Sequence, residues 1–191
     1  MSPEDPLAPS IRYRWTVLVM LTLVYTFNFI DRQILVILQE PIKADLGLSD
    51  AQLGLLSGFS FALVYVTAGI PIAWLADRGN RRNIVAVSLG FWSFMTALSG
   101  LAQNYGQLLA ARIGVGIGEA GGSPPSHSMV SDYFPAKQRG TALSFYSTGI
   151  YIGILIGFAA GGLIAETFGW RVAFFSSAYR VFFTPCSWFG W

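Results

Sequence analysis

Charged residues are scarce in this chain. Only 12% of its 191 positions are Asp, Glu, Lys or Arg, whereas 53% are hydrophobic, and the mean hydropathy is +0.53. A soluble core of this size does not need that much apolar surface, so the composition excludes a soluble globular domain. The sequence therefore predicts that this chain lies in a lipid bilayer.

Cysteine and histidine are nearly absent as well. The single Cys186 permits no internal disulfide and provides no metal-ligand cluster. The sequence also lacks the G-x-x-x-x-G-K-S/T phosphate loop, which excludes ATP hydrolysis by that route. We therefore expect no enzyme, no metal, no nucleic-acid partner and no cofactor, with a proton gradient as the energy source.

Long apolar runs dominate the sequence instead. A helix needs about 20 mostly apolar residues to span a bilayer, and the uncharged stretches 51–76, 83–111 and 140–165 reach that length. Two further candidates, 15–39 and 108–131, contain a few charges. The predicted fold class is an all-α integral membrane protein with five clear spans and an incomplete sixth, at about 15–39, 51–76, 83–103, 108–131, 140–165 and from about 170.

These spans divide the chain into three parts. Residues 1–13 are predicted to form an amino-terminal tail, and residues 14–175 form the helical bundle. Residues 176–191 form an atypical, truncated tail, because polar residues and Pro185 interrupt the expected sixth span. The linker 40–50 contains helix-stopping Pro41 and Gly47 and is expected to be an external loop, with Ser49 or Asp50 capping the second span.

Basic residues are distributed unevenly between the two ends of the spans. Lys43 and Arg171 are the basic residues of the first, third and fifth linkers. Seven others lie in the amino-terminal tail and the second and fourth linkers: Arg12, Arg14, Arg78, Arg81, Arg82, Lys137 and Arg139. The positive-inside rule then predicts a cytoplasmic amino terminus. We also expect a bacterial-type inner or plasma membrane.

Glycines follow two patterns. Gly116, Gly118 and Gly121 match the G-x-G-x-x-G spacing of dinucleotide folds, but no strand precedes them and no acidic residue follows at the required distance. We interpret them as helix-packing glycines. Span five carries a second set at a spacing of four, which places its members on one helical face: Gly149, Gly153, Gly157 and Gly161.

Four ionisable residues lie within predicted spans: Asp31, Arg32, Arg112 and Glu119. A charge at the bilayer centre costs at least about 2.5 kcal/mol and is usually functional. Arg112 and Glu119 are seven residues apart and share one helical face, and Asp31 and Arg112 are predicted at matching depths, where they could form an ion pair.

Asp31 and Glu119 are candidate proton carriers; the alternative is that the four charges only neutralise each other and hold helices together. His127 could join a proton relay or be an ordinary interfacial residue.

The segment 73–82, Ala-Trp-Leu-Ala-Asp-Arg-Gly-Asn-Arg-Arg, resembles the signature between the second and third helices of the major facilitator superfamily. Its Asp-Arg-x-Asn-Arg-Arg form is similar to that of the spinster branch. Four further segments are also similar to this branch: Phe27-Asn28-Phe29-Ile30-Asp31-Arg32, the segment 112–120, Ser131-Asp132-Tyr133-Phe134-Pro135 with Arg139-Gly140, and Phe168-Gly169-Trp170-Arg171. The resemblance covers about residues 11–175, the amino-terminal half of a twelve-span transporter.

The resemblance implies roles for these residues. Asp31 and Glu119 would be the proton-linked carboxylates, with Arg32 and Arg112 as their partners in the cavity. A cytoplasmic gate would consist of Asp77, Arg78, Arg81, Arg82 and Arg139, although positive-inside charge alone could explain the arginines. Span five departs from the antiporter signature, because Phe158 stands where that signature has proline.

The predicted function is therefore secondary active transport by alternating access, coupled to protons as a symporter or antiporter. The substrate would be a small organic or lipid-like molecule of the sphingolipid or lysolipid kind; Phe27, Phe59, Phe61, Tyr65 and Tyr151 suit an amphiphile but suit a lipid-facing helix equally well. Transport requires a second six-helix bundle, from a missing half or a dimer. The alternatives are an inactive truncated half-transporter and a membrane-embedded receptor or partner-binding protein.

Overall fold

The computed structural model describes residues 10–179, and every regular element within that range is helical. The elements are α1 (Ile11–Ile37), α2 (Gln39–Leu46), α3 (Asp50–Gly54), the π-helical turn η1 (Leu55–Phe59), α4 (Ser60–Arg78), α5 (Arg81–Gly100), α6 (Tyr105–Ala120), α7 (Ser123–Tyr133), α8 (Ala136–Phe168) and α9 (Trp170–Ala178). The predicted tail 1–13 and the truncated tail 176–191 lie largely outside the described residues.

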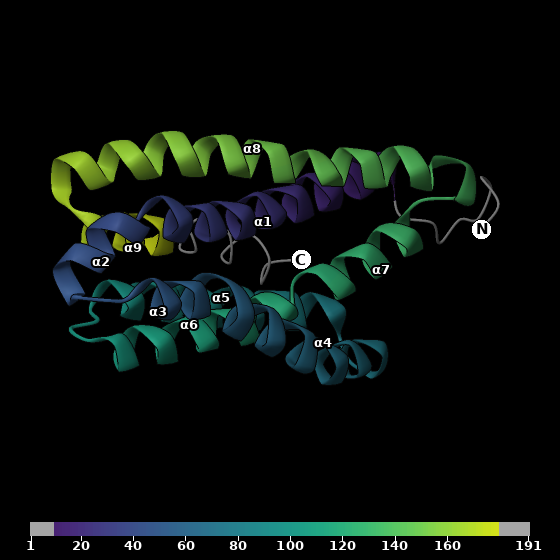
Figure 1. Ribbon diagram of the computed structural model, residues 1–191. Helices are drawn as coiled ribbons and strands as arrows, with labels where there is room; N and C mark the ends of the chain where they lie inside the picture. The colour runs from purple at the N-terminus through teal and green to yellow at the C-terminus, as the bar shows by residue number, and fades with distance from the viewer. Residues whose placement is uncertain (1–9, 180–191) are drawn as a thin grey trace.

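Long helices lie side by side in this bundle (Figure 1). Four of the described helical segments are long and apolar enough to cross a membrane: Ile11–Ile37, Asp50–Arg78, Arg81–Gly100 and Ala136–Phe168. The second of these contains α3, η1 and α4 in one run. In Figure 1, α1 and α8 form one layer, and α3, α4, α5 and α6 form the other.

The predicted span at 108–131 is divided into two helices. Helix α6 ends at Ala120 and α7 begins at Ser123, with Gly121 and Gly122 between them. Pro124 and Pro125 follow in the first turn of α7, where a missing backbone N–H breaks no helical hydrogen bond. The glycine pair and the proline pair together explain why a run of suitable hydropathy does not form one continuous helix.

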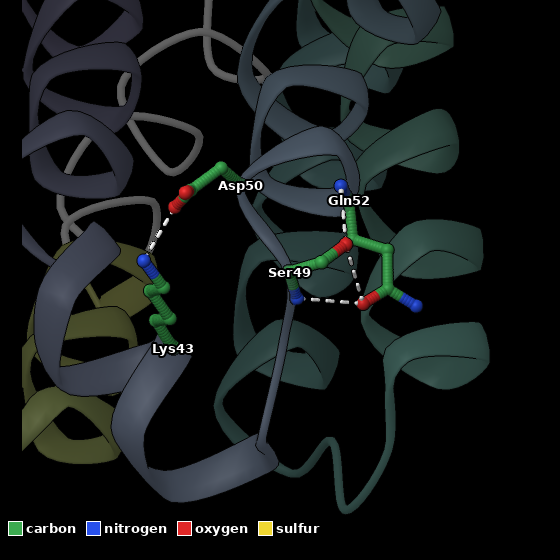
Figure 2. A network of polar contacts seen from close by, with 4 residues as sticks. All are labelled: Lys43, Ser49, Asp50 and Gln52. Atoms are coloured by element: carbon green, nitrogen blue, oxygen red, sulfur yellow. Dashed lines mark hydrogen bonds and ion pairs between the residues drawn. The ribbon is translucent and has the colours of Figure 1, made fainter.

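The predicted loop 40–50 contains a helix of its own. Helix α2 ends where Gly47 adopts a left-handed conformation, with φ of 63°. Ser49 then caps α3: its Oγ accepts from the Gln52 backbone N–H, and the Gln52 side chain accepts from the Ser49 backbone N–H (Figure 2). Lys43 pairs with Asp50 across this turn. Of the two predicted caps, Ser49 performs the role.

Glycines of α8 bring it into close contact with α1. A Cβ added to Gly153 would lie 2.6 Å from the Thr26 carbonyl oxygen, and one added to Gly149 would lie 2.8 Å from the Thr22 carbonyl oxygen. Gly157 and Gly161 meet residues 30–37 in the same order along the chain, so α1 and α8 run in parallel. The predicted stripe therefore holds α1 against α8.

A polar cluster closes the end of the bundle at which α2 lies. The Asp45 carboxylate accepts from Arg171 Nη1 at 2.6 Å and from Trp170 Nε1 at 3.2 Å. Arg171 Nη2 also donates to the Ala102 carbonyl at 3.2 Å. The hydrogen bond from Arg171 lowers the pKa of Asp45 from its usual value. This cluster, which we call the α2 clamp, ties α2 to the start of α9 and to the α5–α6 loop.

Gly153→Ala tests the packing of the glycine stripe. The added methyl group would overlap the Thr26 carbonyl, and overpacking of this kind costs about 1–3 kcal/mol, so the melting temperature of the purified chain should fall. Gly90→Ala in α5 is the matched control, because its Cβ would meet nothing within 4 Å. Equal melting temperatures for the two variants would contradict close α1–α8 packing.

Asp45→Asn tests the α2 clamp. Because the pKa of Asp45 is lower in the folded state, its ion pair stabilises the protein above the unfolded-state pKa of about 3.9 and is lost as the pH falls through the folded-state pKa. The variant should melt earlier than wild type at pH 7, and the difference should shrink as the pH falls into the acidic range. A difference that is constant with pH would show that the Asp45 charge does not contribute.

Candidate substrate and proton site

An ion pair joins α1 to α6 in the interior of the bundle. Arg32 Nε donates to Glu119 Oε2 at 2.8 Å, and the Glu119 side chain is completely buried, whereas 30% of the Arg32 side chain is exposed. Both residues were predicted as site residues from the sequence. The structure brings them together because α1 and α6 each carry one near the middle of the bundle.

Three aromatic rings surround the Arg32 guanidinium. Its Cζ lies 5.3 Å from the ring centroid of Phe29, 5.1 Å from that of Phe61 and 5.0 Å from that of Tyr65. A guanidinium over a ring face is attracted by the ring quadrupole. Phe61 and Tyr65 belong to α4, so α1, α4 and α6 all contact one cation. Phe59 and Tyr151, which the sequence also suggested for an amphiphile, are instead 69% and 74% exposed on the helix surfaces.

The other two predicted site residues lie beside this pair. Arg112 on α6 is buried, and it interacts electrostatically with Glu119 and Asp31. Arg112 Nε and Nη1 and Glu119 Oε1 have no hydrogen-bond partner among residues 10–179. Asp31 accepts a hydrogen bond at 3.1 Å from the indole Nε1 of Trp92. A direct Asp31–Arg112 ion pair stays a prediction; the two groups are within electrostatic reach of each other.

Glycines of α6 make this arrangement sterically possible. A Cβ at Gly118 would lie 2.6 Å from Trp92 Cβ, and one at Gly114 would lie 2.6 Å from Met95 Sδ. Gly116 faces Phe61 on α4, and Gly121 contacts Ser88 on α5. The G-x-G-x-x-G spacing therefore serves helix packing, as the sequence analysis interpreted it.

Comparison with known proteins places this bundle in a family. The Major Facilitator Superfamily profile matches residues 21–186. The chain belongs to this superfamily.

Individual relatives agree with that assignment. An MFS-type efflux pump of Mycolicibacterium smegmatis is 41% identical over 163 residues, which are 85% of this chain and 38% of the pump. A probable galactarate/D-glucarate transporter of Bacillus subtilis is 35% identical over 176 residues, covering 88% of this chain and 38% of that protein. This facilitator chain thus spans less than half the length of these relatives.

A solved structure also matches. The crystal structure of a bacterial homologue of the human lysosomal transporter Spinster, in an inward-facing and unoccupied conformation, superposes with a TM-score of 0.89 at 38% identity, covering 95% of this chain and 43% of that chain. The resemblance to spinster-like facilitators and the all-α integral membrane fold are both confirmed. Because the superfamily consists of transporters, the prediction that the chain is not an enzyme is confirmed as well.

The predicted gate residues of this facilitator lie around the start of α5. Arg81 forms an ion pair with Asp132 of α7, and its Nη2 lies 4.0 Å from Asp77 Oδ1. Arg78 stacks on Trp74, with Cζ 3.9 Å from the ring centroid. The structure thus connects α4, α5 and α7 through Arg81.

The remaining two gate residues lie at the ends of helices. Arg82 lies at the start of α5, where its backbone N–H donates to Asn80 Oδ1 at 3.1 Å. Arg139 Nε donates to the Phe134 carbonyl at 3.1 Å, which stabilises the turn between α7 and α8.

His127 lies beside an aromatic pair and apart from the ion pairs described above. Its Nδ1 is 2.9 Å from the Ser123 carbonyl, and its ring meets Tyr146 edge-on at a centroid distance of 5.0 Å. Tyr146 in turn stacks on Tyr25 at 4.4 Å. These contacts match the interpretation of His127 as an ordinary interfacial residue.

Two functional candidates were not identified from the sequence. Asp132 appeared only as part of a motif, and Trp92 did not stand out within an apolar span. Tryptophan is common in membrane helices, and its sequence context does not reveal which residue its N–H reaches. Asp132 could have been suspected, since it is a carboxylate that follows a span at the same predicted end as Arg81.

Proposed function

We propose that this chain is the amino-terminal bundle of a proton-coupled secondary transporter, with Glu119 and Asp31 as the proton-binding groups. The observation that carries the proposal is the Arg32–Glu119 ion pair with its completely buried carboxylate, which lies next to the buried Arg112, whose Nε and Nη1 have no hydrogen-bond partner among the described residues. If the four charged side chains served only to neutralise each other, each buried donor and acceptor would be expected to have a hydrogen-bond partner. Unpartnered donors and acceptors favour a site that binds something else.

Charge balance supports an anionic substrate. Two carboxylates and two arginines cancel when all four are ionised. Protonation of Glu119 would remove its attraction for Arg32 and leave the site with one net positive charge, which would favour an anion. Arg32 is partly exposed, so its guanidinium is available for bidentate contact with a carboxylate or phosphate.

The substrate class that fits best is therefore an amphiphilic or small organic anion. The three rings around Arg32 provide apolar surface next to the cation, which suits a lipid-like molecule with an acidic head group. One relative is named as a probable galactarate/D-glucarate transporter, which is consistent with an organic anion, whereas the names of the efflux pump and of the Spinster homologue state no substrate.

We further propose that the amino terminus is cytoplasmic, in a bacterial-type plasma membrane, and that a second six-helix bundle completes the transport path. Arg81, with Asp77 and Asp132, would then form a cytoplasmic gate that breaks as the two bundles rock. Arg78, Arg82 and Arg139 would support this gate from neighbouring positions.

Glu119→Gln tests proton coupling. The amide keeps the shape of the side chain and a carbonyl acceptor for Arg32 but cannot carry a charge or exchange a proton. In liposomes that contain this bundle together with its second half, pH-driven uptake should fall at least about tenfold, whereas counterflow exchange of substrate should continue. Unchanged pH-driven uptake would remove Glu119 from the coupling role. The absence of flux in wild type, with a co-purifying protein partner, would favour a receptor.

Asp132→Asn and Asp77→Asn test the gate. Asp132 forms the direct ion pair with Arg81, so its replacement should slow transport at least as much as Asp77→Asn, whose carboxylate lies at 4.0 Å. Neither change should alter the order of preference among substrates, which competition experiments would measure. A changed preference would place these residues in the substrate site instead.

A further inference from the structure

Trp92 is a fully buried side chain with a polar atom directed at the charged site. It lies on α5, is 1% exposed, and donates its indole N–H to Asp31 Oδ2 at 3.1 Å. A buried indole usually finds a hydrogen-bond partner, but here the acceptor is an ionisable group within the proposed proton site. Trp92 therefore contacts an ionisable group of the site, although its own side chain is almost completely buried.

The position of the indole is fixed from two sides. On one side, Trp92 packs in an apolar cluster with Val24 of α1 and with Val85 and Leu89 of α5. On the other side, α6 approaches so closely at Gly118 that an added Cβ would lie 2.8 Å from the Trp92 backbone nitrogen. The direction of the N–H is thus set by the packing of three helices.

This hydrogen bond joins two parts of the bundle that otherwise approach at few points. The backbone of α1 packs mainly against α8, whereas that of α5 packs mainly against α6 and α9. Asp31 and Arg32 are consecutive residues of α1, and each reaches a different helix: Asp31 binds Trp92 on α5, and Arg32 binds Glu119 on α6. Any rotation of α1 would change both bonds together.

We propose that Trp92 is a positioning residue of the proton site: its indole N–H holds the Asp31 carboxylate in place among Arg32, Arg112 and Glu119. The inference rests on the proposed function, in which Asp31 binds protons. Arg32 follows Asp31 on the same helix, and Arg112 on α6 interacts electrostatically with both Asp31 and Glu119. Trp92 adds a neutral donor that favours the ionised carboxylate and fixes its orientation.

Indole NMR of the 191-residue chain in lipid nanodiscs tests the bond directly. The chain has six tryptophans, and loss of one ¹⁵N indole signal in Trp92→Phe assigns Trp92. Asp31→Asn should move the Trp92 signal and leave the others in place. Trp170 provides a matched control, because its indole donates to Asp45, so Asp45→Asn should move the Trp170 signal only.

A Trp92 signal that does not respond to Asp31→Asn would overturn the proposal. If Asp31→Asn fails to give a folded spectrum, Asp31→Ser is the second variant, and the unmoved signals of the other tryptophans report that the chain is folded. These spectra do not depend on transport, so they decide the positioning role even if the proposed function fails.

The pH profile of uptake tests the consequence in a transporter that carries both bundles. Trp92→Phe keeps an aromatic ring but loses the donor, and a carboxylate that loses a donor binds a proton more readily. The half-maximum of pH-driven uptake should therefore move to higher pH, by about one unit if the bond contributes tenfold to proton affinity. A reduced maximal rate with an unmoved half-maximum would indicate only a structural role and would contradict the proposal. Uptake that is independent of pH in wild type would reject the proposed function instead.

Discussion

Four ionisable side chains within apolar helices impose the main constraint on this structure. A single buried charge in a bilayer is costly, and only close partners of opposite sign reduce that cost. Glu119 is buried completely, so Arg32 must lie on a facing helix at hydrogen-bonding distance. The positions of α1 and α6 relative to each other follow from this pair, and the three rings around Arg32 bring α4 to the same point.

Small residues make these contacts geometrically possible. Gly114 and Gly118 allow α5 to approach α6, and Gly149 and Gly153 allow α8 to approach α1. In lipid the hydrophobic effect does not drive helices together, so such close backbone contacts and a few polar bonds supply much of the association. Helix α9 packs against α5 in one layer and against α8 in the other, and side-chain contacts add further links. Arg32–Glu119 and Trp92–Asp31 are polar examples, and the Val24–Leu89–Trp92 contacts are apolar ones.

Exposed ion pairs lie at both ends of the bundle. At the end where α1 begins, Arg81 bridges α4, α5 and α7 through carboxylates that are largely exposed. At the opposite end, the α2 clamp joins Asp45 to Arg171 and through it to the α5–α6 loop. Exposed ion pairs contribute little stability each and can be exchanged at low cost, which is compatible with the gate proposed around Arg81.

The sequence by itself determined that this protein lies in a bilayer, the location of its four strongly apolar helices and the identity of the four ionisable residues within the predicted spans. Hydropathy and charge are local properties, and a charge inside a span is visible without knowledge of its partner. The spacing of the glycines likewise predicted a shared face on α8. Local signals also suggested Ser49 or Asp50 as a cap, of which the structure has Ser49, although α2 was not predicted within the loop that precedes it.

Only the tertiary structure decided which charges meet. The sequence suggested Asp31 with Arg112 from their depths, a pair that stays a prediction, and the structure adds an ion pair between Arg32 and Glu119 and a hydrogen bond from Trp92 to the Asp31 carboxylate. Depth fixes the height of a residue in the membrane but not the direction in which its side chain points. That direction depends on the rotation of each helix, which is set by glycine contacts between elements far apart in the chain. For the same reason the role of Trp92 became apparent only in three dimensions.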